Sequence, residues 1–147
     1  MLFRSIGVLV QFIQNPGNVH WEALKHVIIY LESMKNLWLT FGGQSSTTVE
    51  GFCDTDWVSS THWHSISGYS FHMERGAVSW SSKKQYIIAL STTEAEYIAL
   101  THVAKEALWL RTFLSELRGV PYGPVPINCD NQGAVALSKD NQFHVRM

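Results

Sequence analysis

Three acidic residues stand at positions where a carboxylate could do chemistry. Asp54 interrupts an apolar segment that is predicted to be a strand, Glu96 heads the apolar stripe of the longest predicted helix, and Asp130 separates a short strand from a short helix. Asp54 and Asp130 also have ordinary interpretations, as a solvated strand end and as a helix N-cap. Asp56 lies on the same strand face as Asp54, so spacing leaves both open as ligands. A carboxylate in apolar surroundings is costly unless it is paired or binds a metal ion, which makes these residues candidates for a functional site.

The start of the longest predicted helix decides which of its two first glutamates faces the sheet. Glu96 lies in line with apolar residues spaced four and three apart, so its side chain is predicted to point at the sheet. Glu94 is rotated away by two residues and completes a capping box with Ser91. The alternative makes Thr93 the cap and Glu96 its partner, and the spacing leaves this alternative open.

Convergence of the three acids would favour a metal ion. Neighbouring carboxylates repel one another and raise each other's pKa, and divalent cations remove that conflict. Hard oxygen ligands favour Mg²⁺ or Mn²⁺ over zinc. Two such ions about 4 Å apart can activate a water and stabilise the leaving oxygen in phosphodiester cleavage. We therefore expect metal-dependent phosphoryl chemistry, provided that the acids meet.

The order of predicted elements indicates how the acids could meet. Residues 42–48 are the best linker in the chain, so we predict a boundary between residues 1–42 and 48–147. A helix at 19–35 and a strand at 37–41 are expected before the linker. After it, patterning predicts strands at 49–57, 65–73, 77–82 and 125–129 and helices at 92–117 and 131–139. This order is typical of an α/β fold with a mixed sheet, antiparallel over its first three strands and parallel where the long helix crosses over.

Composition excludes several classes of protein. The chain has 147 residues, enough for one substantial core, and its formal charge of −1 gives no basic field for non-specific nucleic-acid binding. Only 16% of residues are charged, against about 25% in ordinary domains, which suggests a piece that normally packs against more protein. Cys53 and Cys129 are too few for a disulfide framework, and we interpret both as small strand residues. With no signal sequence and no long apolar run, we expect an intracellular protein, in a cytoplasmic particle or the nucleus, that is not secreted and does not enter a membrane.

Six short motifs resemble one family. They are DTDW at 54–57, SISGY at 65–69, SWSSKKQ at 79–85, ALSTTEAEY at 89–97, KEALWL at 105–110 and CDNQ at 129–132. In this order they resemble the ribonuclease H region of copia-type retrotransposon polyproteins. Residues 14–17 and 20–25 are similar to the segment that joins the family's reverse transcriptase to its ribonuclease H.

The resemblance implies a ribonuclease H-like fold and cleavage of the RNA strand of RNA–DNA hybrids with two Mg²⁺ (or Mn²⁺) ions. By motif, Asp54, Glu96 and Asp130 match the family's catalytic, metal-binding acids, which selects Asp54 over Asp56. Weaker candidates for contact with the substrate are Lys83, Lys84, Asn131 and Gln132.

The resemblance also marks what the sequence lacks. In the family, the segment that follows the position of residues 143–146 supplies a further strand and a last helix, and that helix carries a fourth acidic ligand. The sequence up to Met147 contains neither element. We therefore expect an incomplete ribonuclease H-like domain after a remnant of the reverse transcriptase region in residues 1–42. The alternative function is an inactive retroelement remnant that keeps the fold and acts at most as a nucleic-acid-binding or protein-interaction module. Expected partners are an RNA–DNA hybrid, the upstream reverse transcriptase domain and a second copy bound through the helix at 19–35.

Overall fold

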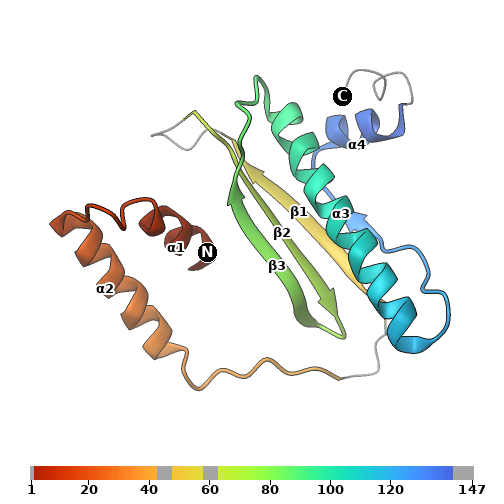
Figure 1. Cartoon of the computed structure of the whole chain (residues 1–147), viewed down its shortest axis with the longest axis horizontal. Coiled ribbons are helices and arrows are strands. Elements are labelled where there is room, and N and C mark those ends of the chain that lie inside the picture. The colour runs from red at the N-terminus through yellow and green to blue at the C-terminus, as the bar shows by residue number, and fades with distance from the viewer. Residues whose placement is uncertain (1, 43–47, 58–62, 141–147) are drawn as a thin grey trace. The chain divides into compact units, whose positions relative to one another are not determined.

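The computed structural model describes residues 2–42, 48–57 and 63–140, and the chain divides into two compact units, Met1–Thr40 and Phe41–Met147 (Figure 1). The middle of the predicted linker, residues 43–47, and the family position at 143–146 lie outside the described residues.

The first unit consists of two helices, α1 (Leu2–Val10) and α2 (Asn18–Ser33). α2 confirms the helix predicted at 19–35, whereas α1 has no counterpart among the predicted elements. The ring of Phe12, just after α1, stacks on the ring of His20 in α2, with centroids 4.0 Å apart. No residue of α2 is buried, so its apolar side chains are available for contact with another surface.

The strand predicted at residues 37–41 is wrong. These residues belong to no helix or strand, and their large apolar side chains are exposed, Trp38 to 88%. A strand needs a neighbour that satisfies its backbone N–H and C=O groups, and within the described ranges no strand pairs with this segment. The apolar composition of the segment was therefore a poor guide to its secondary structure.

The second unit is built on a mixed sheet, as predicted. Its strands in the described residues are β1 (Glu50–Asp56), β2 (Ile66–Met73), β3 (Gly76–Lys84) and β4 (Ile127–Asn128). β1, β2 and β3 pair antiparallel, and β4 pairs parallel to β1, which gives the order β3-β2-β1-β4. Glu74 and Arg75 both have positive φ and make the two-residue turn between β2 and β3. β4 is shorter than the strand predicted at 125–129.

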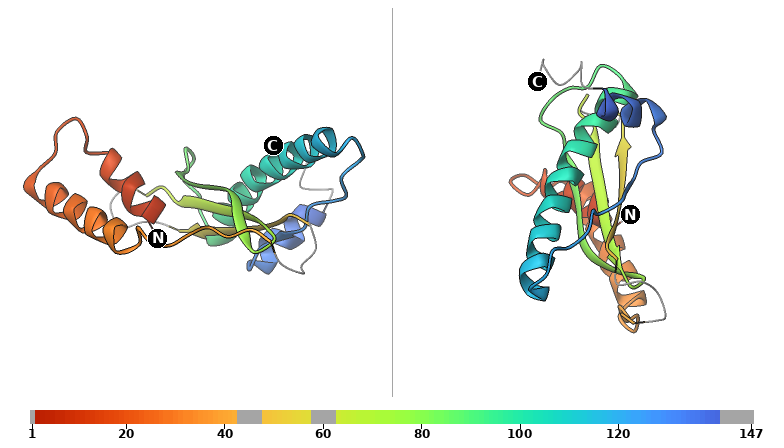
Figure 2. Two further views of the ribbon diagram at one scale, coloured as in Figure 1. Left: turned by 90° about the horizontal axis from the view of Figure 1, so that it is seen from below. Right: turned by 90° about the vertical axis from the view of Figure 1, so that its right-hand side faces the viewer.

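A long helix, α3 (Thr92–Arg118), lies across one face of this sheet (Figures 1 and 2). Its buried residues are Ala95, Glu96, Ala99, Val103, Ala107, Leu110 and Leu114. The predicted stripe runs through Glu96, Leu100, Val103, Ala107, Leu110, Leu114 and Leu117; of these, Leu100 is half-buried and Leu117 is exposed. The fully buried Phe71 of β2 belongs to the same core. The helix ends at Gly119, whose φ of 68° is a left-handed conformation that suits glycine.

The start of α3 is fixed by two side chains. Ser91 Oγ accepts a hydrogen bond from the Glu94 amide (3.1 Å), which makes Ser91 the N-cap. The Glu94 carboxylate in turn accepts from the Leu90 amide (2.7 Å). The alternative with Thr93 as the cap is therefore wrong, and Glu96 has no part in capping the helix.

Candidate metal centre

Glu96 is the buried acid of the second unit. It lies in the second turn of α3, and only 7% of its surface is exposed. Its Oε1 accepts a hydrogen bond from the Thr55 amide of β1 (3.1 Å). Its Oε2 is buried and has no hydrogen-bond partner among the described residues. Because a buried charged oxygen without a partner destabilises the fold, this atom is where a cation would be most stabilising.

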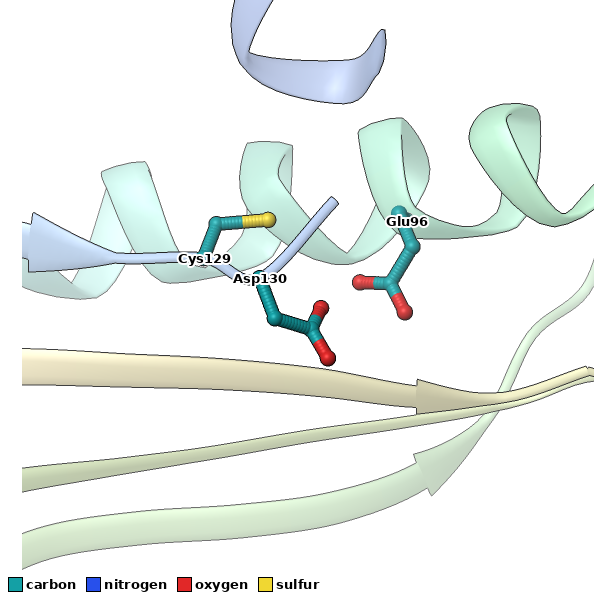
Figure 3. Close-up of side chains that lie close together, drawn as sticks. All are labelled: Glu96, Cys129 and Asp130. Carbon is teal, nitrogen blue, oxygen red and sulfur yellow. The ribbon is translucent and has the colours of Figure 1, made fainter. Parts of the chain in front are cut away.

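Two residues that follow β4 lie against Glu96. The side chains of Cys129 and Asp130 come close to the Glu96 carboxylate (Figure 3), and one ligand atom from each of the three lies within 4.8 Å of the others. Cys129 is half-buried and Asp130 is exposed. Asp130 does not cap the following helix, α4 (Gln132–Lys139), because Asn131 supplies that cap: its Oδ1 accepts from the Ala134 amide at 2.9 Å.

Asp54 stands near this group but outside it. It is an exposed residue of β1, and its carboxylate is not among the ligand atoms that gather within 4.8 Å. Its charge nevertheless reaches Glu96. Burial raises the pKa of Glu96, the negative charges of Asp130 and then Asp54 raise it further, and hydrogen bonds from Thr55 lower it. The structure thus brings Glu96 and Asp130 together, places Asp54 within electrostatic reach, and leaves Asp56 half-buried two residues further along β1.

Cys129 is the member of the group that sequence reasoning missed. The parallel pairing of β1 with β4 sets Phe52 opposite Asn128, so the next residues, Cys53 and Cys129, follow side by side. The Cys53 thiol is buried and donates to the Asn128 carbonyl (3.5 Å). Burial, followed by the hydrogen bond with Cys129, raises the pKa of Cys53 to about 12. The sequence shows only that a Cys-Asp pair occurs twice, at 53–54 within β1 and at 129–130 just after β4; the pairing of the two strands brings them together.

The donor set fits a divalent cation. Glu96 and Asp130 offer two carboxylates, which are the ligands that Mg²⁺ and Mn²⁺ prefer. The unpartnered Glu96 Oε2 is the observation that tests the fit, because a cation beside it would satisfy this oxygen and offset the repulsion between the two acids.

The two lysines predicted to contact substrate line a separate cavity. Lys83 and Lys84 lie at the end of β3 and border a cavity of about 450 Å³ between β2, β3 and α3. His102 and Lys105 of α3 line the same cavity, so its wall carries three lysines. Neither of the predicted amide residues lies there: Asn131 is the helix cap, and Gln132 is the exposed first residue of α4.

None of the helices in the described part of the chain combines the length and hydropathy that a membrane crossing requires. No protein-family model matches the sequence, and no solved structure matches it.

Comparison with curated proteins identifies relatives over nearly the whole chain. The chain is 43% identical over 144 residues to a retrovirus-related Pol polyprotein from transposon TNT 1-94 of Nicotiana tabacum, covering 97% of this chain and 11% of that protein. It is 33% identical over 147 residues to the Pol polyprotein from transposon RE2 of Arabidopsis thaliana, covering 99% of this chain and 10% of the relative. A secreted RxLR effector protein of Plasmopara viticola is 41% identical over 119 residues, 80% of this chain and 84% of the effector.

The chain therefore spans about a tenth of the length of the transposon polyproteins and most of the length of the effector. The similarity to the polyproteins covers both structural units, from the helices of the first to the sheet and long helix of the second. The chain is thus similar to one segment of retrotransposon Pol polyproteins, which supports a retroelement origin.

Proposed function

We propose that the second unit is a ribonuclease H-type domain that cleaves the RNA strand of RNA–DNA hybrids. The observation that carries the proposal is the Glu96 carboxylate, buried with one oxygen unpartnered beside Asp130 and within reach of the charge of Asp54. The similarity to retrotransposon Pol polyproteins and the order of strands around a crossover helix support it. A structural role for these acids would predict ion pairs or caps, and Glu96 and Asp130 make neither within the described residues.

Asp54, Glu96 and Asp130 would hold Mg²⁺ or Mn²⁺. When bound, such ions supply an activated water and stabilise the charge that develops on the leaving oxygen. Glu96 is the fixed member, because the Thr55 amide anchors one of its oxygens and α3 holds it against β1. Asp54 and Asp130 are exposed, so a phosphodiester can approach their carboxylates from solvent.

The cavity lined by lysines would hold the nucleic acid. Lys83, Lys84 and Lys105 line the cavity together with one acid, Glu106, so the charged groups of its wall are net positive in a chain whose net charge is −1. Lysines bind phosphates as point charges and position a duplex without reading its sequence. The cavity borders α3, the helix that carries Glu96, and Lys105 lies nine residues after Glu96, about 13 Å further along the helix axis.

The test is cleavage of a hybrid labelled on its RNA strand, by the full chain with Mg²⁺ or Mn²⁺. Asp54→Asn keeps the size of the side chain and should lower the cleavage rate by about 100-fold or more, as expected when a charge that acts in the transition state is removed. Glu94→Gln is the matched control, since the Glu94 carboxylate accepts from the Leu90 amide and is not among the gathered ligand atoms. Unchanged cleavage in Asp54→Asn would contradict the proposal.

Binding of the hybrid is tested separately. Lys105→Ala should weaken binding of the hybrid and reduce the slope of its salt dependence by about one. Lys25→Ala is the control, because Lys25 lies in the first unit and pairs with Glu22 (2.8 Å). Equal losses in the two variants would argue against a phosphate-binding role for the cavity.

A second candidate function is an interaction module without nuclease activity. It is favoured by the similarity to the P. viticola effector, of which the chain covers 84%, and by the exposed apolar side chains of α2. The partner would be the reverse transcriptase region or a second copy of the chain. Absence of cleavage with either metal, together with a sedimentation profile that shifts with concentration and reverts in Ile28→Ser, would favour this candidate; Ile28 is 54% exposed.

A further inference from the structure

The acidic group contains a thiol that a magnesium site does not need. Cys129 Sγ lies with the carboxylate oxygens of Glu96 and Asp130 within 4.8 Å, and the three side chains converge from the end of β4 and from α3 (Figure 3). Glu96 is nine-tenths buried, its carboxylate faces Asp130 and Cys129 (Figure 3), and its Oε2 has no hydrogen-bond partner among the described residues. A cysteine and a buried, unsatisfied carboxylate therefore share one small space.

Ligand chemistry separates this set from an all-oxygen site. Mg²⁺ takes oxygen ligands in octahedral geometry and has little affinity for sulfur. Zn²⁺ binds thiolate, imidazole and carboxylate groups, usually with four ligands at the corners of a tetrahedron. One thiolate and two carboxylates would fill three of these corners and leave the fourth for water, which is the arrangement of an open zinc site.

The spacing of the donors suits such an ion. Zinc–sulfur bonds of about 2.3 Å and zinc–oxygen bonds of about 2.1 Å place the ligand atoms of a tetrahedron roughly 3.6 Å apart. Because the ligand atoms all lie within 4.8 Å of one another, the side chains need to close by no more than about an ångström. Asp130 is exposed and Cys129 is half-buried, so rotation of these two side chains can supply that movement while Glu96 stays anchored to Thr55.

We propose that this centre binds a zinc-class ion through Cys129, Glu96 and Asp130. The Cys129 thiol loses its proton to solvent as the sulfur–metal bond forms, and the two carboxylates bind as anions. Such an ion competes with Mg²⁺, because it takes two of the same carboxylates; this competition, unlike the binding itself, rests on the proposed nuclease function. Zinc-class ions would then inhibit cleavage of the hybrid.

Cys53 provides an internal control. It is buried in the core, its thiol contacts the Asn128 carbonyl (3.5 Å), and its sulfur is not among the gathered ligand atoms. The two cysteines of the chain thus differ in the property that the inference uses: the sulfur of Cys129 is one of the gathered ligand atoms, and the sulfur of Cys53 is not.

Cobalt titration of the reduced full chain tests the binding. Co²⁺ bound by a thiolate gives a near-ultraviolet charge-transfer band, and Zn²⁺ should displace it. The band should be lost in Cys129→Ser and kept in Cys53→Ser, and Zn²⁺ affinity in Cys129→Ser should fall by at least about tenfold. Folding of both variants is checked by circular dichroism. A band that survives in Cys129→Ser, or no band in the unmodified chain, would overturn the inference.

A second measurement needs no variant. Zn²⁺ should slow alkylation of Cys129 in the native chain, as followed by mass spectrometry of its peptide, and Glu96→Gln should remove that protection. Equal alkylation rates with and without Zn²⁺ would also overturn the inference. If the cobalt band is present but no hybrid is cleaved, the nuclease proposal fails and the zinc site stands. If the hybrid is cleaved but no band appears, the zinc site is overturned and the nuclease proposal stands.

Discussion

Replacing Glu96 by glutamine in the metal-free chain should raise the stability of the fold. The carboxylate is buried, one of its oxygens has no partner among the described residues, and the charges of Asp130 and Asp54 lie nearby. Glutamine has nearly the same shape, its Oε1 can still accept from the Thr55 amide, and its amide can donate toward Asp130. The substitution removes the repulsion and keeps the contact.

The size of the gain follows from the spacing of the acids. Glu96 and Asp130 offer oxygens within 4.8 Å, for which Coulomb's law gives a repulsion of about 1 kcal/mol in water and about 3.5 kcal/mol at an effective dielectric of 20. Because Asp130 is exposed, we expect the lower half of this range, about 1–2 kcal/mol. For a domain of this size each kcal/mol raises Tm by about 3–4 °C.

The gain should depend on pH with a definite sign. The pKa of Glu96 is raised above its ordinary value of 4.5 in the folded chain. Below pH 4.5 the residue is protonated in both states, so Glu96→Gln should then have little effect. As the pH rises toward the folded pKa, the unfolded chain ionises first and the wild type loses stability. The advantage of glutamine is complete above that folded pKa.

Thermal unfolding in EDTA measures the effect, with Glu94→Gln as the matched control. Glu94 lies in the first turn of α3, where removal of its charge should cost about 0.3–1 kcal/mol. Adding Mg²⁺ should stabilise the wild type and leave Glu96→Gln unchanged. A Glu96→Gln chain that melts below the wild type in EDTA at neutral pH would refute the reasoning, because the charge would then be stabilising.

Three further predictions concern the fold and are measured by urea denaturation. Gly51→Ala places a Cβ 2.6 Å from a ring carbon of Phe71, so it should destabilise by about 1–3 kcal/mol, and an unchanged midpoint would mean that the ring can move aside. Tyr122→Phe removes the hydroxyl that accepts from the buried Val49 amide (2.8 Å). This should cost about 1–3 kcal/mol of unfolding free energy, and no loss of stability would contradict the contact. Ser91→Ala removes the cap of α3 and should cost about 1 kcal/mol, which Ser91→Asn should restore.

The sheet and the long helix could be predicted because their patterns reflect burial on one face. The spacing from Glu96 to Leu114 identified the buried side of α3, and it also distinguished Glu96 from Glu94. Ser91 was recognisable as a cap because a serine three residues before a glutamate has a local, physical reason to begin a helix. These features depend on neighbours within one or two turns.

The features that were missed depend on distant partners. Residues 37–41 have the composition of a strand, but whether such a segment forms a strand is decided by the presence of a neighbour to pair with. Cys129 joined the acidic group because of the parallel register between β1 and β4, which no local pattern reveals. Asp130 was harder to interpret than Glu96, because only the structure shows that Asn131 supplies the cap.

The bond from the Thr55 amide to Glu96 also has a consequence for solution experiments. β4 pairs with only Gly51 and Phe52 of β1, so the Thr55 N–H donates to a titratable side chain instead of to that strand. Exchange of this hydrogen with deuterium should slow when Glu96 ionises, since an anion is the better acceptor. One backbone resonance in an NMR spectrum would thus report the charge state of the centre, without a substrate and without a label on the site.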